Sequence, residues 1–100
     1  MSGQPMPPVK AFPISILSVE KSGSVATIEF DQFVNLSGVP KYTTSIEGVT
    51  AISAAMTSPN TLVVTFSAAI TAATNLVIPF EDPAIRNSSG GFANPGTFPF

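Results

Sequence analysis

The stretch Asn60-Thr-Leu-Val-Val-Thr-Phe-Ser67 decides the fold class of this chain. Within it, Leu62, Val64 and Phe66 occupy every second position, and β-branched residues stand between them. Successive side chains of a β-strand point to opposite faces, so a period of two predicts a half-buried strand with these three side chains facing a core. β-branched and aromatic residues also suit the pleated surface of a sheet. We therefore predict a strand over residues 61–67.

The same alternation recurs on both sides of this strand, at residues 25–30 and 75–80. The side chains expected to face the core there are Ala26, Ile28, Phe30, Leu76, Ile78 and Phe80. Weaker strand patterns, separated by turn residues, cover residues 14–19, 42–46, 49–56 and 97–100. The Ala-rich residues 68–73 lack the apolar period of a helix and are expected to form a connection. Short strands at this spacing predict an all-β fold, an antiparallel β-sandwich of about seven strands.

Charged residues are scarce, at 10% of the chain, against about 25% in ordinary soluble domains. One hundred residues with 44% apolar side chains are enough for one domain with a two-layer core. The four basic residues are widely spaced, so there is no basic stripe to neutralise phosphates and we expect no nucleic-acid binding. A surface with so few charges suits a protein that is packed among other proteins or lies outside the cell.

The chain contains no Cys, no His and no Trp. The absence of Cys excludes disulfide bonds and thiolate metal sites, and the absence of both Cys and His removes the usual pairs of nucleophile and base. The six acidic residues lie at the ends of predicted strands or in turns, where solvated charge is the ordinary interpretation. Catalysis by a carboxylate pair would need a buried, perturbed carboxylate, which nothing in the pattern indicates. We predict no enzyme activity, no catalytic residue and no cofactor.

The loop over residues 81–91 is the one place where the sequence suggests a cation. Glu81, Asp82 and Asn87 supply oxygen atoms, which Ca²⁺ prefers as ligands. Their spacing matches no established calcium loop, so an ordinary polar turn is the favoured interpretation. Gly90-Gly91 is not followed by Lys and Ser or Thr, which a phosphate-binding loop would require.

Residues 1–13 form a Pro-rich N-terminal arm ahead of the sandwich predicted over residues 14–100. Proline fixes φ and removes amide donors, so the arm is expected to be extended. It is either a disordered leader or an arm that docks on a neighbouring molecule. At the other end, residues 98–100 either form the last strand or serve as an apolar hook in a short C-terminal tail. The candidate partner-binding residues of the two ends are Pro5, Met6, Pro7, Pro8, Val9, Phe12, Phe92, Phe98 and Phe100.

Three segments carry a family resemblance. They are Tyr42-Thr-Thr-Ser-Ile-Glu-Gly-Val49, the stretch 60–67, and Phe80-Glu-Asp-Pro-Ala-Ile-Arg-Asn-Ser-Ser-Gly-Gly-Phe-Ala93. In this order they resemble the bacterial immunoglobulin-like (Ig-like) repeats of cell-surface and swimming-motility proteins. The closing motif departs from the family, because Asn87 stands where an aspartate is usual and Gly91 replaces a final asparagine. The resemblance implies an Ig-like sandwich that serves as a spacer or adhesion module, and it implies nothing about catalysis.

Such repeats usually occur in long arrays on secreted proteins, whereas this chain carries one copy. The N-terminal residues do not resemble a secretory signal, and no apolar run is long enough to span a membrane. We therefore expect a structural protein of a bacteriophage virion, made in the host cytoplasm. The preferred role is a capsid decoration (cement) protein that binds a symmetric lattice through its arms and a sheet edge. Its partners would be the major capsid or tail protein and other copies of itself.

Two alternatives remain open. One is a tail, adaptor or fibre component of the same virion. The other is a surface recognition module that binds carbohydrate or a host protein, although Trp is absent and Tyr42 is the only Tyr available as a sugar platform. In every case an exposed edge strand invites aggregation, so we expect the arm or a neighbouring molecule to cover at least one edge.

Overall fold

The computed structural model describes residues 14–100, and this part of the chain is all-β, with no helix. It contains nine strands. They are β1 (Ile16–Ser22), β2 (Val25–Phe30), β3 (Asn35–Leu36), β4 (Thr43–Thr44), β5 (Ala51–Ser58), β6 (Thr61–Phe66), β7 (Asn75–Ile78), β8 (Ile85–Arg86) and β9 (Gly96–Pro99). The prediction of an all-β fold is confirmed.

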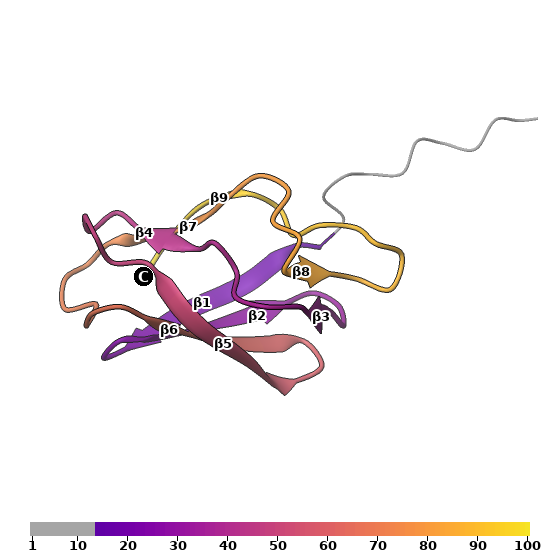
Figure 1. Cartoon of the computed structure of the whole chain (residues 1–100), viewed down its shortest axis with the longest axis horizontal. Helices are drawn as coiled ribbons and strands as arrows, with labels where there is room; N and C mark the ends of the chain where they lie inside the picture. Colours follow the sequence, from indigo (N-terminus) through magenta and orange to yellow (C-terminus); the bar gives the residue numbers. More distant parts are fainter. Residues whose placement is uncertain (1–13) are drawn as a thin grey trace, which may run out of the picture.

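The strands form two main layers that face each other in Figure 1. One layer is a four-stranded antiparallel sheet in the order β1-β2-β6-β5, and the other is a three-stranded antiparallel sheet in the order β4-β7-β9. A small third sheet, β3-β8, lies at one end of the two layers. The chain enters at that same end, where Ile14 forms a parallel bridge with Ala93 before β1 begins.

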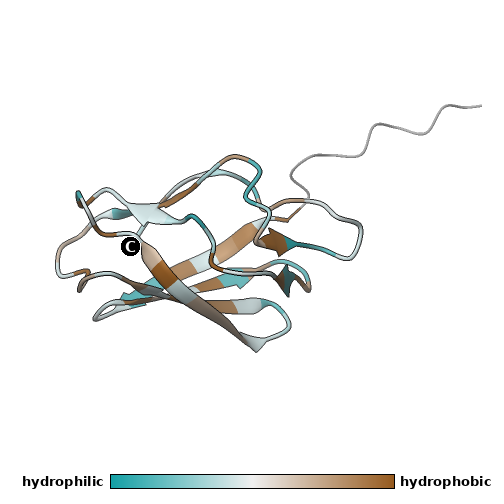
Figure 2. Cartoon of the chain, in the orientation of Figure 1, coloured by the Kyte–Doolittle hydropathy of each residue, from teal (hydrophilic) through white to brown (hydrophobic). Residues whose placement is uncertain are grey.

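The core between the two layers is one cluster of apolar side chains. The cluster forms because apolar and polar residues alternate along the strands of the four-stranded sheet, so that one face of the sheet is apolar (Figure 2). The buried residues on the predicted inner faces are Ala26, Ile28, Phe30, Leu62, Val64, Phe66, Leu76 and Ile78. Full burial of a side chain the size of Leu, Ile or Phe contributes about 1.5–3 kcal/mol. Every core position predicted from the period of two is confirmed except Phe80.

Phe80 was predicted to face the core, and that prediction is wrong, since 66% of its surface is exposed. The alternation ends earlier than the sequence pattern indicates, because β7 stops at Ile78 and Pro79 follows without an amide hydrogen to donate. The chain then turns through Glu81, whose φ of 53° lies in the left-handed region. This turn directs Phe80 away from the core.

The strand bounds differ from the predicted ones where the apolar pattern is weak. The first strand is Ile16–Ser22 rather than residues 14–19, the strand predicted at 42–46 shrinks to Thr43–Thr44, and that predicted at 49–56 is Ala51–Ser58. The final strand is present as Gly96–Pro99, and residues 68–73 form a connection without a helical turn. Nine strands replace the expected number of about seven, because β3 and β8 are only two residues long and pair with each other.

Candidate interaction surface

Two long connections meet at one end of the sandwich, which we call the loop end. It consists of residues 31–42, between β2 and β4, and residues 79–95, between β7 and β9. The tight turn at Pro59–Asn60 lies at the same end, because Phe30 N donates to Asn60 O at 2.9 Å and Val34 N donates to Pro59 O at 3.0 Å. Loops held by a rigid scaffold are where binding residues most often lie.

Hydrogen bonds join the two connections along their length. The β3–β8 pairing is extended by Ser37 N, which donates to Ala84 O at 2.8 Å. Lys41 N donates to Asp82 Oδ2 at 2.7 Å, and Asn87 Nδ2 donates to Gln32 Oε1 at 2.9 Å. These hydrogen bonds fix the backbones of the two connections relative to each other.

Asp82 and Asn87 use their oxygens to shape the loop. Asp82 is only 7% exposed, and its Oδ1 accepts from Ala84 N at 3.1 Å while its Oδ2 accepts from Lys41 N. Asn87 Oδ1 accepts from Ser89 N at 3.0 Å and from Gly91 N at 2.8 Å. Among residues 14–100 no three acidic side chains gather in a way that could hold a metal ion. The favoured interpretation of residues 81–91, a polar turn, accounts for both side chains.

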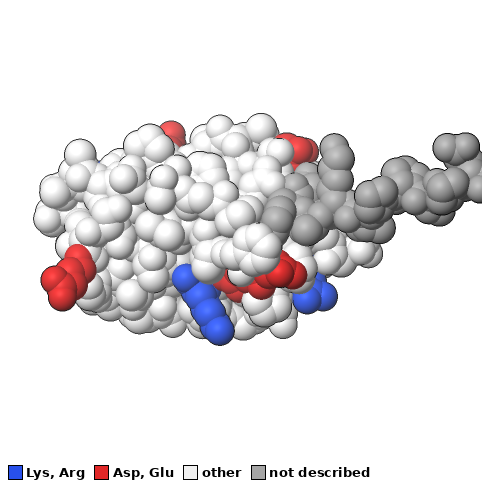
Figure 3. Space-filling model, turned by 90° about the horizontal axis from the view of Figure 1, so that it is seen from above, with Lys and Arg blue, Asp and Glu red and all other residues white. Residues whose placement is uncertain are grey.

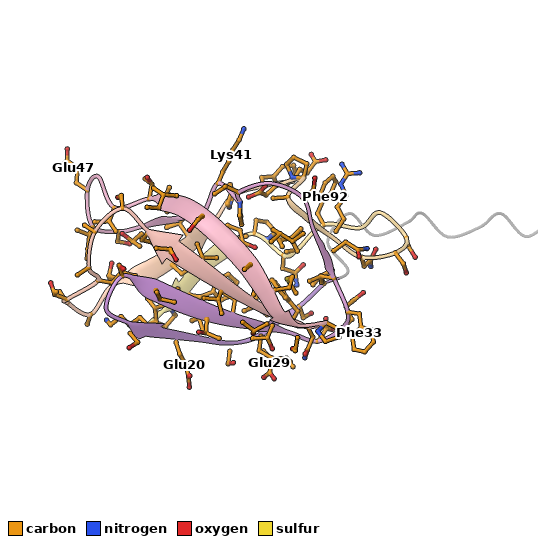
Figure 4. All side chains as sticks on the ribbon, turned by 60° about the horizontal axis from the view of Figure 1, so that its bottom comes forward. Glu20, Glu29, Phe33, Lys41, Glu47 and Phe92 are labelled. Atoms are coloured by element: carbon orange, nitrogen blue, oxygen red, sulfur yellow. The ribbon has the colours of Figure 1, made fainter. Side chains whose placement is uncertain are left out.

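Exposed apolar side chains concentrate at the loop end. Phe33 is 73% exposed and Phe80 is 66% exposed, and Val39, which shares the 31–42 connection with Phe33, is also exposed. Phe92 is half-buried, with the guanidinium carbon of Arg86 4.5 Å from its ring centroid, a cation–π arrangement. Figure 4 shows Phe33 and Phe92 at one end of the molecule and Glu47 at the opposite end. Exposed aromatic rings on ordered loops mark this end as the candidate interaction surface.

The predicted partner-binding residues fall into three groups. Pro5, Met6, Pro7, Pro8, Val9 and Phe12 lie outside the described residues. Phe92 lies at the loop end. Phe98 and Phe100 lie at the opposite end of the sandwich, because β9 runs away from the loop end. The structure therefore does not bring the C-terminal pair together with Phe92.

Phe98 and Phe100 belong to the sheet rather than to a free hook. Both side chains are partly buried and pack against the core. Thr74 and Phe100 exchange backbone hydrogen bonds of 3.2 and 2.9 Å, which continue the β7–β9 ladder. Lys21 Nζ also donates to the backbone oxygens of Ala72 and Phe100, each at 2.8 Å. Of the two alternatives for residues 98–100, the structure favours the strand.

The surface residues that sequence reasoning missed are Phe33, Val39 and Phe80. Phe33 and Val39 had a detectable signal, because each is a large apolar residue in a segment predicted to be a loop. Phe80 carried no signal of exposure, because it continues the apolar alternation of residues 75–78 and is therefore predicted to face the core. Tyr42, the only tyrosine, is buried and offers no platform for a sugar ring.

The rest of the surface has little relief or charge. The described residues enclose no pocket. Figure 3 shows isolated charged side chains on a face that is otherwise uncharged. No helix within residues 14–100 could cross a membrane. No family model, curated protein or solved structure matches this chain.

Proposed function

We propose that this chain is an Ig-like, non-enzymatic module that binds another protein through its loop end. The observation that carries the proposal is the concentration of exposed Phe33, Val39 and Phe80 on two connections that are hydrogen-bonded to each other. Exposed aromatic anchors that are already ordered lose little conformational entropy on binding. Exposed aromatic anchors of this kind suit a protein partner.

Strand order supports the Ig-like assignment. With β3 and β8 set aside, because they pair only with each other, the remaining strands can be named A to G in chain order. The sheet β1-β2-β6-β5 then becomes A-B-E-D, and the sheet β4-β7-β9 becomes C-F-G. This is the arrangement of constant-type Ig domains. The loop end carries the B–C and F–G connections, which lie at the binding end of variable Ig domains.

The setting we propose is a virion, with the chain as a capsid decoration protein that binds a symmetric lattice. Support comes from the scarcity of charged residues, 10% of the chain, and from the apolar side chains that are exposed at the loop end. Many weak apolar contacts, repeated by symmetry, give a lattice-bound protein high avidity. A tail, adaptor or fibre component would use the same surface.

The test first measures the number of copies of this chain on purified virus particles, and it then measures how tightly the chain binds again to particles that lack it. Quantitative mass spectrometry should give a simple symmetric ratio of this chain to the major shell protein. Particles that lack the chain should bind it again, and Phe33→Ser with Phe80→Ser should weaken rebinding by more than about tenfold. Glu47→Ser replaces an exposed side chain at the end opposite the loop end and serves as the control, with binding retained. Absence of the chain from particles, together with no rebinding, would overturn the virion setting.

A recognition module is the second candidate, because exposed aromatic residues gather on loops here. Phe33 and Phe80 lack the polar group with which Tyr and Trp usually assist sugar binding, so a host surface protein is the better target within this class. Saturable binding of the purified chain to host cells, weakened by the same double variant, would favour this candidate over the virion setting.

A further inference from the structure

The edge strand β5 differs from the other long edges of the two main sheets. Its sequence, Ala51-Ile-Ser-Ala-Ala-Met-Thr-Ser58, contains no charged residue and no proline. On the opposite edge of the same sheet, β1 carries Glu20 and Lys21, and in the other sheet β9 carries Pro99. Charges, prolines and bulges are the usual devices that keep edge strands from pairing with another molecule. Among the described residues, β5 is the long edge that lacks charges and prolines, and its bulges lie only near its two ends.

The pairing of β5 shows which of its backbone groups point outward. On β6, Phe66 N donates to Ser24 O on the β2 side, and Ser67 N donates to Thr50 O on the β5 side. Because backbone direction alternates along a strand, the residues of β5 that lie opposite Val64 and Leu62 direct their backbone groups away from β6. These residues are Ala54 and Met56. Their N–H and C=O groups are available to a further strand.

Irregularities at both ends leave a short regular stretch in the middle of β5. The register shifts between Ala51 and Ser53 and again between Met56 and Ser58. Bulges of this kind confine regular pairing to Ser53–Met56. Ile52 lies at the first irregularity and is 58% exposed. A partner strand could therefore pair with the four residues Ser53–Met56, and the exposed side chain of Ile52 lies next to this stretch.

We propose that β5 pairs antiparallel with β5 of a second copy of this chain, across a two-fold axis near Ala54 and Ala55. A two-fold contact brings two copies of the same strand together, so a charge close to the axis lies near its own copy. The uncharged β5 avoids this repulsion in every register, whereas β1 carries Glu20 and Lys21. Small side chains at residues 53–55 permit close approach, and the net charge of −2 gives little long-range repulsion.

This pairing would join two four-stranded sheets into one continuous sheet of eight. It would cover an edge without charge or proline, and it would cover Ile52. Because β5 runs from one end of the sandwich to the other, antiparallel pairing places the loop ends of the two copies at opposite ends of the dimer. The consequence, which rests on the proposed function, is a bivalent protein that bridges two binding partners.

The first test measures the mass of the full chain in solution over a range of concentrations, together with amide hydrogen exchange. We expect a concentration-dependent dimer, with exchange at Ala54 and Met56 slowed by roughly tenfold or more as the dimer forms. The Ala55 amide, which faces β6, should show no such dependence. A chain that stays monomeric would overturn the proposal. Slow exchange at Ala54 in a monomer would mean that residues 1–13 cover the edge instead.

The second test uses opposite charges near the proposed axis. Ala55→Lys and Ala55→Glu, at an exposed position of β5, should each be monomeric, and a mixture of the two should form a heterodimer. Rescue in the mixture excludes misfolding as the cause. Ser22→Lys places the same charge on the β1 edge and should leave the dimer intact. Dimers that tolerate Ala55→Lys would contradict the proposal. These readouts need no loop-end partner, so their failure is separate from that of the proposed function.

Discussion

The phenol of Tyr42 lies in the core beside an acidic side chain. Its hydroxyl has no hydrogen-bond partner, and the residue is almost fully buried. Burial raises the pKa of this phenol well above its ordinary value of 10.0, and the charge of the Asp82 carboxylate raises it further. Above about pH 10 the unfolded chain therefore releases the phenolic proton while the folded protein keeps it. The free energy of unfolding should fall as the pH rises through this range.

Because Tyr42 is the only tyrosine, its ionisation can be followed directly. In an alkaline titration we expect phenolate absorbance to appear only together with loss of the β-sheet circular dichroism signal. Tyr42→Phe should lose less stability above about pH 10 than the unmodified chain. Phenolate absorbance at about pH 10 in a protein that is still folded would show that the hydroxyl reaches solvent.

Asp82 stabilises the loop end by accepting from two backbone amides, Lys41 N and Ala84 N. Replacing it with Ala leaves both donors without this acceptor in a buried environment, so Asp82→Ala should lower the free energy of unfolding by about 3 kcal/mol. Asp82→Asn retains one carbonyl oxygen and should lose less. Urea unfolding measures both changes, with the exposed Glu47→Ala as control. Equal stability of Asp82→Ala and the control would show that other groups order the connection.

At the scale of elements, a side chain of β1 helps to hold the chain at the far end of β9. Lys21 Nζ donates to two backbone oxygens, and it lies 5.6 Å from the ring centroid of Phe100. Lys21→Met removes these bonds, which are worth about 1 kcal/mol for a partly exposed group. We expect roughly fivefold faster amide exchange at Phe100 and no change in β2 or β6. Lys21→Arg, which keeps the charge, should exchange more slowly than Lys21→Met.

Strands with a clear period of two were predictable from the sequence, whereas β3 and β8 were not. The strand 25–30 was predicted with its observed bounds, because each of its inward residues is apolar and turns flank it. β3 and β8 have two residues each, which is too short for a period, and they form by pairing with each other across the chain. Phe80 shows the opposite failure, since its alternation is present in the sequence but Pro79 and the turn at Glu81 end the strand.

The candidate surface is a property of the whole molecule, and this is why the sequence predicted so little of it. Residues 31–42 and 79–95 are far apart along the chain, and only the crossing between the two sheets brings them to one end. Phe92 was a predicted contact residue and does lie there, but its ring stacks with Arg86, a contact that no pattern in the sequence indicates. The sequence shows Phe33 as an apolar residue in a predicted loop, but it does not show which residues lie near Phe33 in the folded protein.

Folding and binding should therefore be separable in this molecule. Phe30 is fully buried in the core while Phe33, three positions later, is 73% exposed at the loop end. Phe30→Ala should lower the free energy of unfolding by about 3–5 kcal/mol, because it leaves a cavity between the sheets. Phe33→Ser removes a side chain that is mostly in water, so unfolding should change by less than about 0.5 kcal/mol.

Urea unfolding of the two variants, measured alongside rebinding to the partner, tests this separation. Phe33→Ser should unfold like the unmodified chain and still bind more weakly, which only a contact residue would do. If Phe33→Ser destabilised the fold as much as Phe30→Ala, its ring would belong to the folding core, and the exposed aromatic residues would no longer mark a binding surface. Unchanged stability with unchanged binding would move the contact away from the loop end, and the lattice or host partner would have to be sought on the β-sheet faces instead.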